Sequence, residues 1–153
     1  MGISVEQATP MAAIYPKAVI LHRVIAKLID FLLIAVMRQL LPPAGLYIGI
    51  TYLLIADGLF NGKSIGKQLV GLQTTIPQRN KQASFRESII RNFPLLIAYL
   101  FLLFIPIAGW VLFSTIIGLE LLLMIGNEKG LRIGDELAHT QVVDSESFEI
   151  RNL

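Results

Sequence analysis

Residues 93–126 read FPLLIAYLFLLFIPIAGWVLFSTIIGLELLLMIG, the longest apolar stretch of the chain. A helix that crosses a membrane needs only about 20 residues, so this stretch is long enough for two. Between Ile105 and Gly109 a proline and a glycine favour a tight turn. Glu120 is the only charged residue in the stretch. We therefore predict two membrane-spanning helices joined by a short turn.

Two more apolar stretches precede this one. The first covers residues 18–41, and the second begins at Pro42 or Pro43 and ends at Phe60. Each has about the length that a spanning helix needs. The predicted fold class is therefore an all-α integral membrane protein with four transmembrane helices.

The third helix is expected to begin before its apolar run. Ser84 and Glu87 have the spacing of a capping box, in which each side chain bonds to the backbone N–H of the other residue. We therefore expect the third helix over 84–104 and the fourth over 110–126.

The composition agrees with a membrane protein and excludes several classes of function. Of the 153 residues 54% are hydrophobic and 16% charged, whereas soluble domains carry about 25% charged residues. The net charge of +2 is too weak to indicate a nucleic-acid partner, and the absence of cysteine excludes disulfides and Cys-ligated metals. No nucleophile with an adjacent base is evident. We therefore expect neither an enzyme nor a protein with a cofactor or metal.

The basic residues predict the orientation in the membrane. Short cytoplasmic loops carry an excess of Lys and Arg, and the segment between the second and third helices is rich in both. We therefore place this segment and both termini in the cytoplasm, for a multi-pass protein of the inner cell membrane. The chain is divided into a cytoplasmic segment 1–17, a transmembrane domain 18–143 and a tail 144–153.

The central loop is expected to contain a small hairpin. Residues 68–76 have strand character, residues 78–81 have turn character, and 140–143 is a candidate partner strand. In the same loop we expect Lys63 and Lys67 to face lipid phosphates.

Charged residues within the predicted membrane segments are the main candidates for function, because such residues are costly in a bilayer and need partners. Arg23, Lys27 and Asp30 lie on one face of the first helix, at spacings of four and three residues. Asp57 lies at about the depth of Arg23, and Glu120 at about the depth of Asp30. We therefore expect the pair Arg23–Asp57, and for Glu120 either a pair with Lys27 or a carboxyl that stays protonated.

The order of these residues resembles that of the RDD family of small bacterial membrane proteins, named for one arginine and two aspartates. Arg23 and Asp30 match the first two, and Asp135 matches the third. Three further blocks resemble the family, and they read NGKSIGKQLVGL over 61–72, SFRESIIRN over 84–92 and DELAHT over 135–140.

The chain also departs from the family pattern. His139 stands where the family usually has glycine, and Gly134 stands where it often has histidine. From the blocks together we infer an Arg23–Asp57–Asp135 cluster that closes the cytoplasmic side of the bundle.

Two readings of function follow. The resemblance implies transport, linked in some members to sodium/proton exchange, and in that reading Asp30 and Glu120 bind a monovalent cation or a proton. In the other reading the buried charges are structural ion pairs of a scaffold, or of a protein that binds lipids or a partner. Gly45 and Gly49 form a GxxxG motif, which supports helix packing either within the bundle or in a homodimer.

Overall fold

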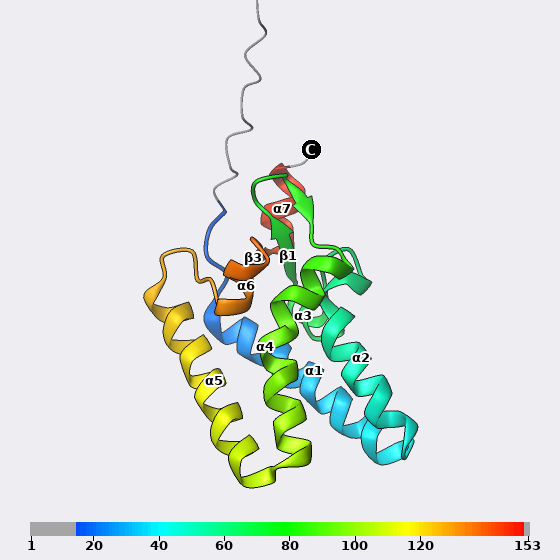
Figure 1. Cartoon of the computed structure of the whole chain (residues 1–153). Helices are drawn as coiled ribbons and strands as arrows, with labels where there is room; N and C mark the ends of the chain where they lie inside the picture. Colours follow the sequence, from blue (N-terminus) through cyan, green and yellow to red (C-terminus); the bar gives the residue numbers. More distant parts are fainter. Residues whose placement is uncertain (1–14, 152–153) are drawn as a thin grey trace, which may run out of the picture.

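The computed structural model describes residues 15–151 and consists mainly of helices (Figure 1). The long helices are α1 (Ile20–Leu40), α2 (Ala44–Leu59), α4 (Phe85–Phe104) and α5 (Pro106–Gly126). The shorter elements gather at one end of these helices as a cap, formed by α3 (Ile65–Val70), β1 (Leu72–Ile76), β2 (Lys81–Gln82), α6 (Ile133–Leu137), β3 (Gln141–Asp144) and α7 (Ser145–Arg151).

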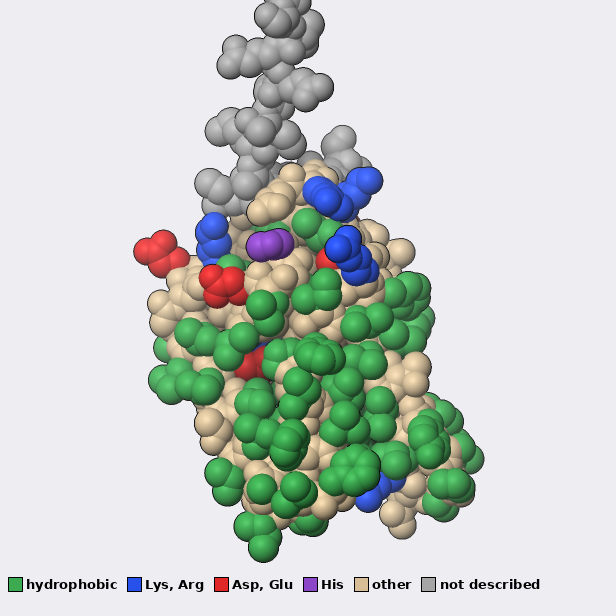
Figure 2. Space-filling model, viewed as in Figure 1, with side chains coloured by type: hydrophobic (Ala, Val, Ile, Leu, Met, Phe, Trp, Pro, Cys, Tyr) green, Lys and Arg blue, Asp and Glu red, His purple; other side chains and the backbone are tan. Residues whose placement is uncertain are grey.

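The helices α4 and α5 form the predicted hairpin, and both are long and apolar enough to cross a membrane. Only 33% of the α4 span and 17% of the α5 span are buried, so most of their apolar side chains face outward. Figure 2 shows hydrophobic side chains over the half of the molecule away from the cap. The core helix of a soluble protein would be mostly covered, so this exposure agrees with a membrane setting.

The starting residues of α4 and α5 agree only in part with those predicted from the sequence. Ser84 and Glu87 form the predicted capping box at the start of α4. The expected start of α5 at Trp110 was wrong, because α5 begins at Pro106. Proline is well tolerated in the first turn of a helix, where its missing N–H has no partner to lose.

The helices α1 and α2 pack antiparallel, and α2 in turn packs on α4. At Gly45 a Cβ atom would lie 2.0 Å from the backbone oxygen of Met37, and at Gly49 it would lie 2.8 Å from the side chain of Ile34. Within this chain the GxxxG motif therefore serves the contact between α1 and α2.

The cap contains a three-stranded antiparallel sheet in the order β2-β1-β3. Thr74 pairs with Val142 and Thr75 with Gln141, so the predicted pairing between the central loop and the 140–143 segment is confirmed. The strand expected to begin at residue 68 was wrong, because residues 65–70 form α3. The Ser64 side chain accepts a hydrogen bond from the Lys67 N–H at the start of α3, and Gly71 ends this helix at φ 75°.

The C-terminal segment that follows β3 belongs to the cap. It forms α7, on which Phe148 is buried together with Val143 and Tyr15. The rings of Tyr15 and Phe148 lie 6.0 Å apart.

Candidate functional site

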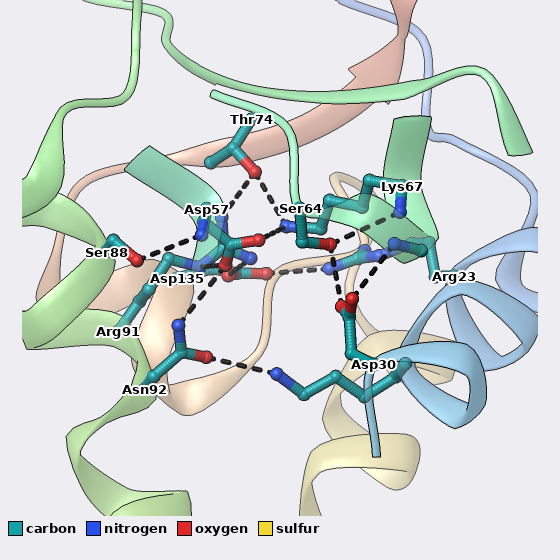
Figure 3. A network of polar contacts seen from close by, with 12 residues as sticks. Arg23, Asp30, Asp57, Ser64, Lys67, Thr74, Ser88, Arg91, Asn92 and Asp135 are labelled. Atoms are coloured by element: carbon teal, nitrogen blue, oxygen red, sulfur yellow. Dashed lines mark hydrogen bonds and ion pairs between the residues drawn. The ribbon is translucent and has the colours of Figure 1, made fainter. Parts of the chain in front are cut away.

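The charged residues of α1, α2, α4 and the cap meet in one buried network (Figure 3). The described residues include eight buried charged side chains, which we call the charge network. Four are basic and four are acidic: Arg23, Lys67, Arg91 and Arg132, and Asp30, Asp57, Glu120 and Asp135. A buried charge is costly unless it is paired and hydrogen-bonded, so each carboxylate needs an account of its partners.

Asp135, at the start of α6, is the centre of the network. Its carboxylate lies 2.7 Å from Arg23 Nη2, 2.6 Å from Arg91 Nη2 and 3.4 Å from Arg132 Nη2. Arg23 also donates a hydrogen bond to the backbone oxygen of Gly130. Asp135 therefore joins α1, α4 and the segment before α6 through one fully buried carboxylate.

Asp57, near the end of α2, is the second centre. Lys67 Nζ donates to its Oδ1 at 2.5 Å, and Arg91 Nε lies 3.3 Å from its Oδ2. Asn92 donates to the same Oδ2 at 3.3 Å. The Thr74 hydroxyl accepts bonds from both Lys67 and Arg91, at 2.8 and 2.7 Å. Arg91 thus links Asp57 to Asp135.

Asp30, in the middle of α1, is held by neutral donors. The hydroxyls of Tyr52 and Ser64 each donate to it at 2.6 Å, and the Gly66 N–H donates at 2.9 Å. The Gly66 N–H belongs to the first turn of α3, so the carboxylate docks α1 against the cap.

Glu120, on α5, has the fewest contacts of the four carboxylates. Its Oε2 lies 3.4 Å from Arg132 Nη1. Within the described part of the chain its buried Oε1 has no hydrogen-bond partner.

The predicted pairs were right in one case and wrong in two. Arg23 reaches Asp135, as the inferred cluster requires. The pair Arg23–Asp57 was wrong, because Lys67 and Arg91 occupy the Asp57 carboxylate. The inferred cluster is thus connected through Arg91 instead of by direct contact.

The pair Lys27–Glu120 was also wrong. Glu120 is paired with Arg132, whereas Lys27 Nζ donates to Asn92 Oδ1 at 3.2 Å. Equal depth in two separate helices does not bring side chains together, and the partner of Glu120 is instead Arg132, from the segment after α5.

The expectation that Lys63 and Lys67 face lipid is wrong for Lys67. Its side chain is 8% exposed and lies between Asp57 and Thr74. Lys63 is half-buried, with its Nζ 4.0 Å from Glu149. Position in a basic loop therefore did not predict which lysine is internal.

Several residues of the charge network, and two hydroxyls that donate to it, were not identified as candidates from the sequence. Arg91 is fully buried. Its position among the apolar residues Ile89, Ile90 and Phe93 at the start of a span could have indicated this burial. Arg132 had the signal of lying three residues before Asp135. No pattern singled out Ser64 or Tyr52, because isolated hydroxyls occur throughout the chain.

The electrostatics of the cap follow from burial and charge. Burial alone would raise the pKa of Asp135, but Arg132, Arg91 and Arg23 hold it well below its usual range. Burial alone would lower the pKa of Arg132. The attraction of the carboxylates of Asp135 and Glu120 is stronger, so the pKa of Arg132 is raised. Burial and the repulsion from Arg91 lower the pKa of Lys67 to about 7, against the attraction of Asp57.

Next to the network lies a cavity of about 530 Å³ between α1, α4 and α5. Most of its wall is apolar, with Phe31, Leu95, Phe113 and Trp110 among the lining residues. Phe31 and Phe113, both in the lining, meet edge to face with ring centroids 5.9 Å apart. Its polar lining is formed by Arg23, Lys27, Asp30, Lys67, Tyr99, Glu120 and Arg132. The cavity is therefore apolar along one side and charged at one end.

With this geometry in view, the sequence was compared with known proteins. The RDD family profile matches residues 39–139. The chain belongs to the RDD family. Members of this family are small membrane proteins, which agrees with the two apolar helices. Arg23 and Asp30 precede the matched stretch. Neither a curated protein nor a solved structure matches the chain.

The two departures from the family pattern have local structural consequences. At Gly134 a Cβ atom would lie 1.9 Å from the backbone oxygen of Arg91, so α6 lies directly on α4 and no larger residue fits. His139 adopts a left-handed conformation with φ 52°, in which the glycine usual for the family is free of strain.

Proposed function

We propose that this RDD protein is a non-enzymatic membrane protein in which the charge network is structural and the adjacent cavity binds a lipid-like molecule. In this proposal α1, α2, α4 and α5 cross the inner cell membrane and the cap lies on the cytoplasmic side. The positive charge of the segment between α2 and α4 supports this orientation. The outward-facing leucines of α1, among them Leu21, Leu28 and Leu32, support a lipid setting for this helix.

The proposal rests mainly on the fact that Asp30, Asp57 and Asp135 are already bound by other groups of the protein. Asp57 and Asp135 each lie between several basic groups, and Asp30 accepts three hydrogen bonds. A site that exchanges cations needs carboxylate oxygens that are free to bind them, and these oxygens are occupied by the protein itself. The apolar wall of the cavity, in contrast, has no polar group to satisfy and suits an acyl chain.

The test is native mass spectrometry on protein purified from membranes and delipidated. A lipid-like adduct is expected to rebind to the wild type and to be lost in Ala35→Phe, because Ala35 lines the cavity and phenylalanine fills it. Ala108→Phe is the matched control, since Ala108 is an exposed residue of α5 outside the cavity lining. Equal retention of the adduct in both variants would exclude the cavity as its site.

Monovalent cation/proton exchange is the second candidate, and one observation favours it. Glu120 Oε1 is buried without a hydrogen-bond partner among residues 15–151, and Glu120 lines the same cavity as Asp30. Liposomes with a trapped pH-sensitive dye separate the two proposals. A pH change on addition of sodium, potassium or lithium that is lost in Glu120→Gln and Asp30→Asn would establish exchange and overturn the structural reading.

A further inference from the structure

The charged residues in the cavity lining indicate which charge a bound lipid-like molecule would carry. Among the described residues the charge network contains four basic and four acidic side chains, and each basic group lies within 3.4 Å of a carboxylate. Lys27 is additional to this set. It is half-buried, and it lines the cavity on the same helix as Arg23 and Asp30.

Lys27 has no ion-pair partner within the part of the chain that the structure describes. An ammonium group has three donors, and the contacts of Lys27 Nζ are one hydrogen bond to Asn92 and the ring of Phe31 at 5.6 Å. Asn92 is neutral, and its amide nitrogen is already directed at Asp57. The cavity is therefore lined by one ammonium group that has no carboxylate within ion-pair distance among the described residues.

The acidic residues of the lining form no ion pair with Lys27. Asp30 is turned toward Tyr52, Ser64 and Gly66, and Glu120 is paired with Arg132. A cation bound in the cavity would be repelled by the ammonium group of Lys27. A ligand with one negative charge would instead pair with it, and such a charge-assisted contact is stronger than a hydrogen bond between neutral groups.

Resting on the lipid-binding function proposed above, we propose that the ligand is a single-chain monoanionic amphiphile of the fatty-acid class. Its carboxylate contacts Lys27 Nζ, and its chain lies against the apolar wall formed by residues such as Phe113, Ile117 and Leu121. The volume of about 530 Å³ is in the range of small-molecule sites, roughly 300–1,000 Å³, and suits one acyl chain better than a whole two-chain lipid.

The single tryptophan of the chain provides the measurement. Trp110 lines the cavity, and bromine atoms on an acyl chain quench tryptophan fluorescence on contact. The full-length protein is placed in phosphatidylcholine nanodiscs and titrated with mid-chain brominated stearic acid at a pH at which the acid is ionised. Brominated stearyl alcohol, with the same chain and no charge, and brominated phosphatidylglycerol, an anion with two chains, are titrated in parallel.

We expect saturable quenching by the acid, with an affinity about tenfold or more above that of the alcohol. Lys27→Gln is expected to remove this difference and Lys27→Arg to retain it. Lys63→Gln is the matched control, because Lys63 is also half-buried but lies outside the cavity lining and near Glu149.

The outcomes separate this inference from the function on which it rests. Equal affinity for acid and alcohol in the wild type would overturn the role of Lys27 and leave lipid binding intact. Tighter binding of phosphatidylglycerol than of the acid would overturn the single-chain assignment. No saturable quenching by any of the three probes would overturn both proposals. The comparison of acid with alcohol is made on the wild type, so it decides the matter even if Lys27→Gln does not fold.

Discussion

The cap end of the long helices and the far end of the α4–α5 hairpin are organised in opposite ways. At the cap end, Arg91 and Asp135 are 0% exposed and each has several charged partners. At the far end, Phe104 and Ile107 are 81% and 85% exposed. Apolar contacts are non-directional, whereas ion pairs and hydrogen bonds require particular distances and angles. The difference indicates that charged contacts position the helices at the cap end, whereas the exposed side chains of the far end only need to be apolar.

Two separate segments of the cap converge on one face of α1. The α1 residues Arg23 and Asp30 contact the segment around α6 and the start of α3, respectively. Since a buried pair need not add stability over an apolar one, we interpret these contacts mainly as fixing register. If this division holds, substitutions in the buried network lower stability more than substitutions on the exposed face of the hairpin.

Asp135→Asn is expected to cause the largest loss of stability. The substitution leaves Arg23, Arg91 and Arg132 buried with one carboxylate fewer, and an unpaired buried charge costs about 3–5 kcal/mol. Thermal unfolding in detergent, followed by circular dichroism, measures the effect. Glu136→Gln is the control, because Glu136 is the exposed neighbour of Asp135. Equal melting temperatures for the two variants would contradict the role assigned to Asp135.

Tyr52→Phe tests the docking of α1 through Asp30. Loss of the hydroxyl removes the 2.6 Å bond to Asp30, and a buried acceptor that loses its donor costs about 1–3 kcal/mol. Tyr47→Phe, at a tyrosine of the same helix that is 68% exposed, is expected to leave unfolding unchanged. The same detergent unfolding assay compares the two, and a similar loss in both would indicate a general effect of tyrosine hydroxyls in α2.

The lowered pKa of Lys67 is expected to make the stability of the protein depend on pH. Its pKa is lowered from 10.5 to about 7 in the folded state, so between these values the unfolded chain binds more protons than the folded one. Stability therefore rises with pH in this window, by at most about 1.4 kcal/mol per pH unit. The melting temperature of the wild type is expected to increase as the pH rises above about 7, and Lys67→Met is expected to flatten the slope. A slope that persists unchanged in Lys67→Met would assign it to another group.

Leu122→Ala, in α5, is expected to have the smallest effect, within about 0.5 kcal/mol. Leu122 is 68% exposed, and lipid chains are as apolar as the side chain that they replace. The same unfolding assay, run together with sedimentation of the detergent complex, measures it. A clearly larger loss that accompanies dissociation of a dimer would show that this face of α5 contacts a second copy.

Part of the fold was predictable from the sequence because it depends on local signals. The apolar length of 93–126, the Pro106 break and the Ser84–Glu87 capping box specify the α4–α5 hairpin without reference to any other element. The pairing of β1 with β3 was also predicted, from strand character in two segments far apart in the chain. The short helix α3 was missed, because its N-cap Ser64 lay in a loop whose following residues also have strand character.

The sequence by itself determined that this is an apolar helical chain with charges at unusual places, since both properties can be read from residue types and spacing. Arg23, Asp30, Asp57, Glu120 and Asp135 were recognisable for this reason. Which charge pairs with which was decided only by the tertiary structure. Arg91 and Arg132 come from segments whose approach to α1 and α5 depends on the close contact of α6 with α4 at Gly134, and such a contact between distant backbones leaves no mark on local spacing. The same holds for Lys27, whose ammonium group forms no ion pair within residues 15–151 because the nearby carboxylates contact other groups.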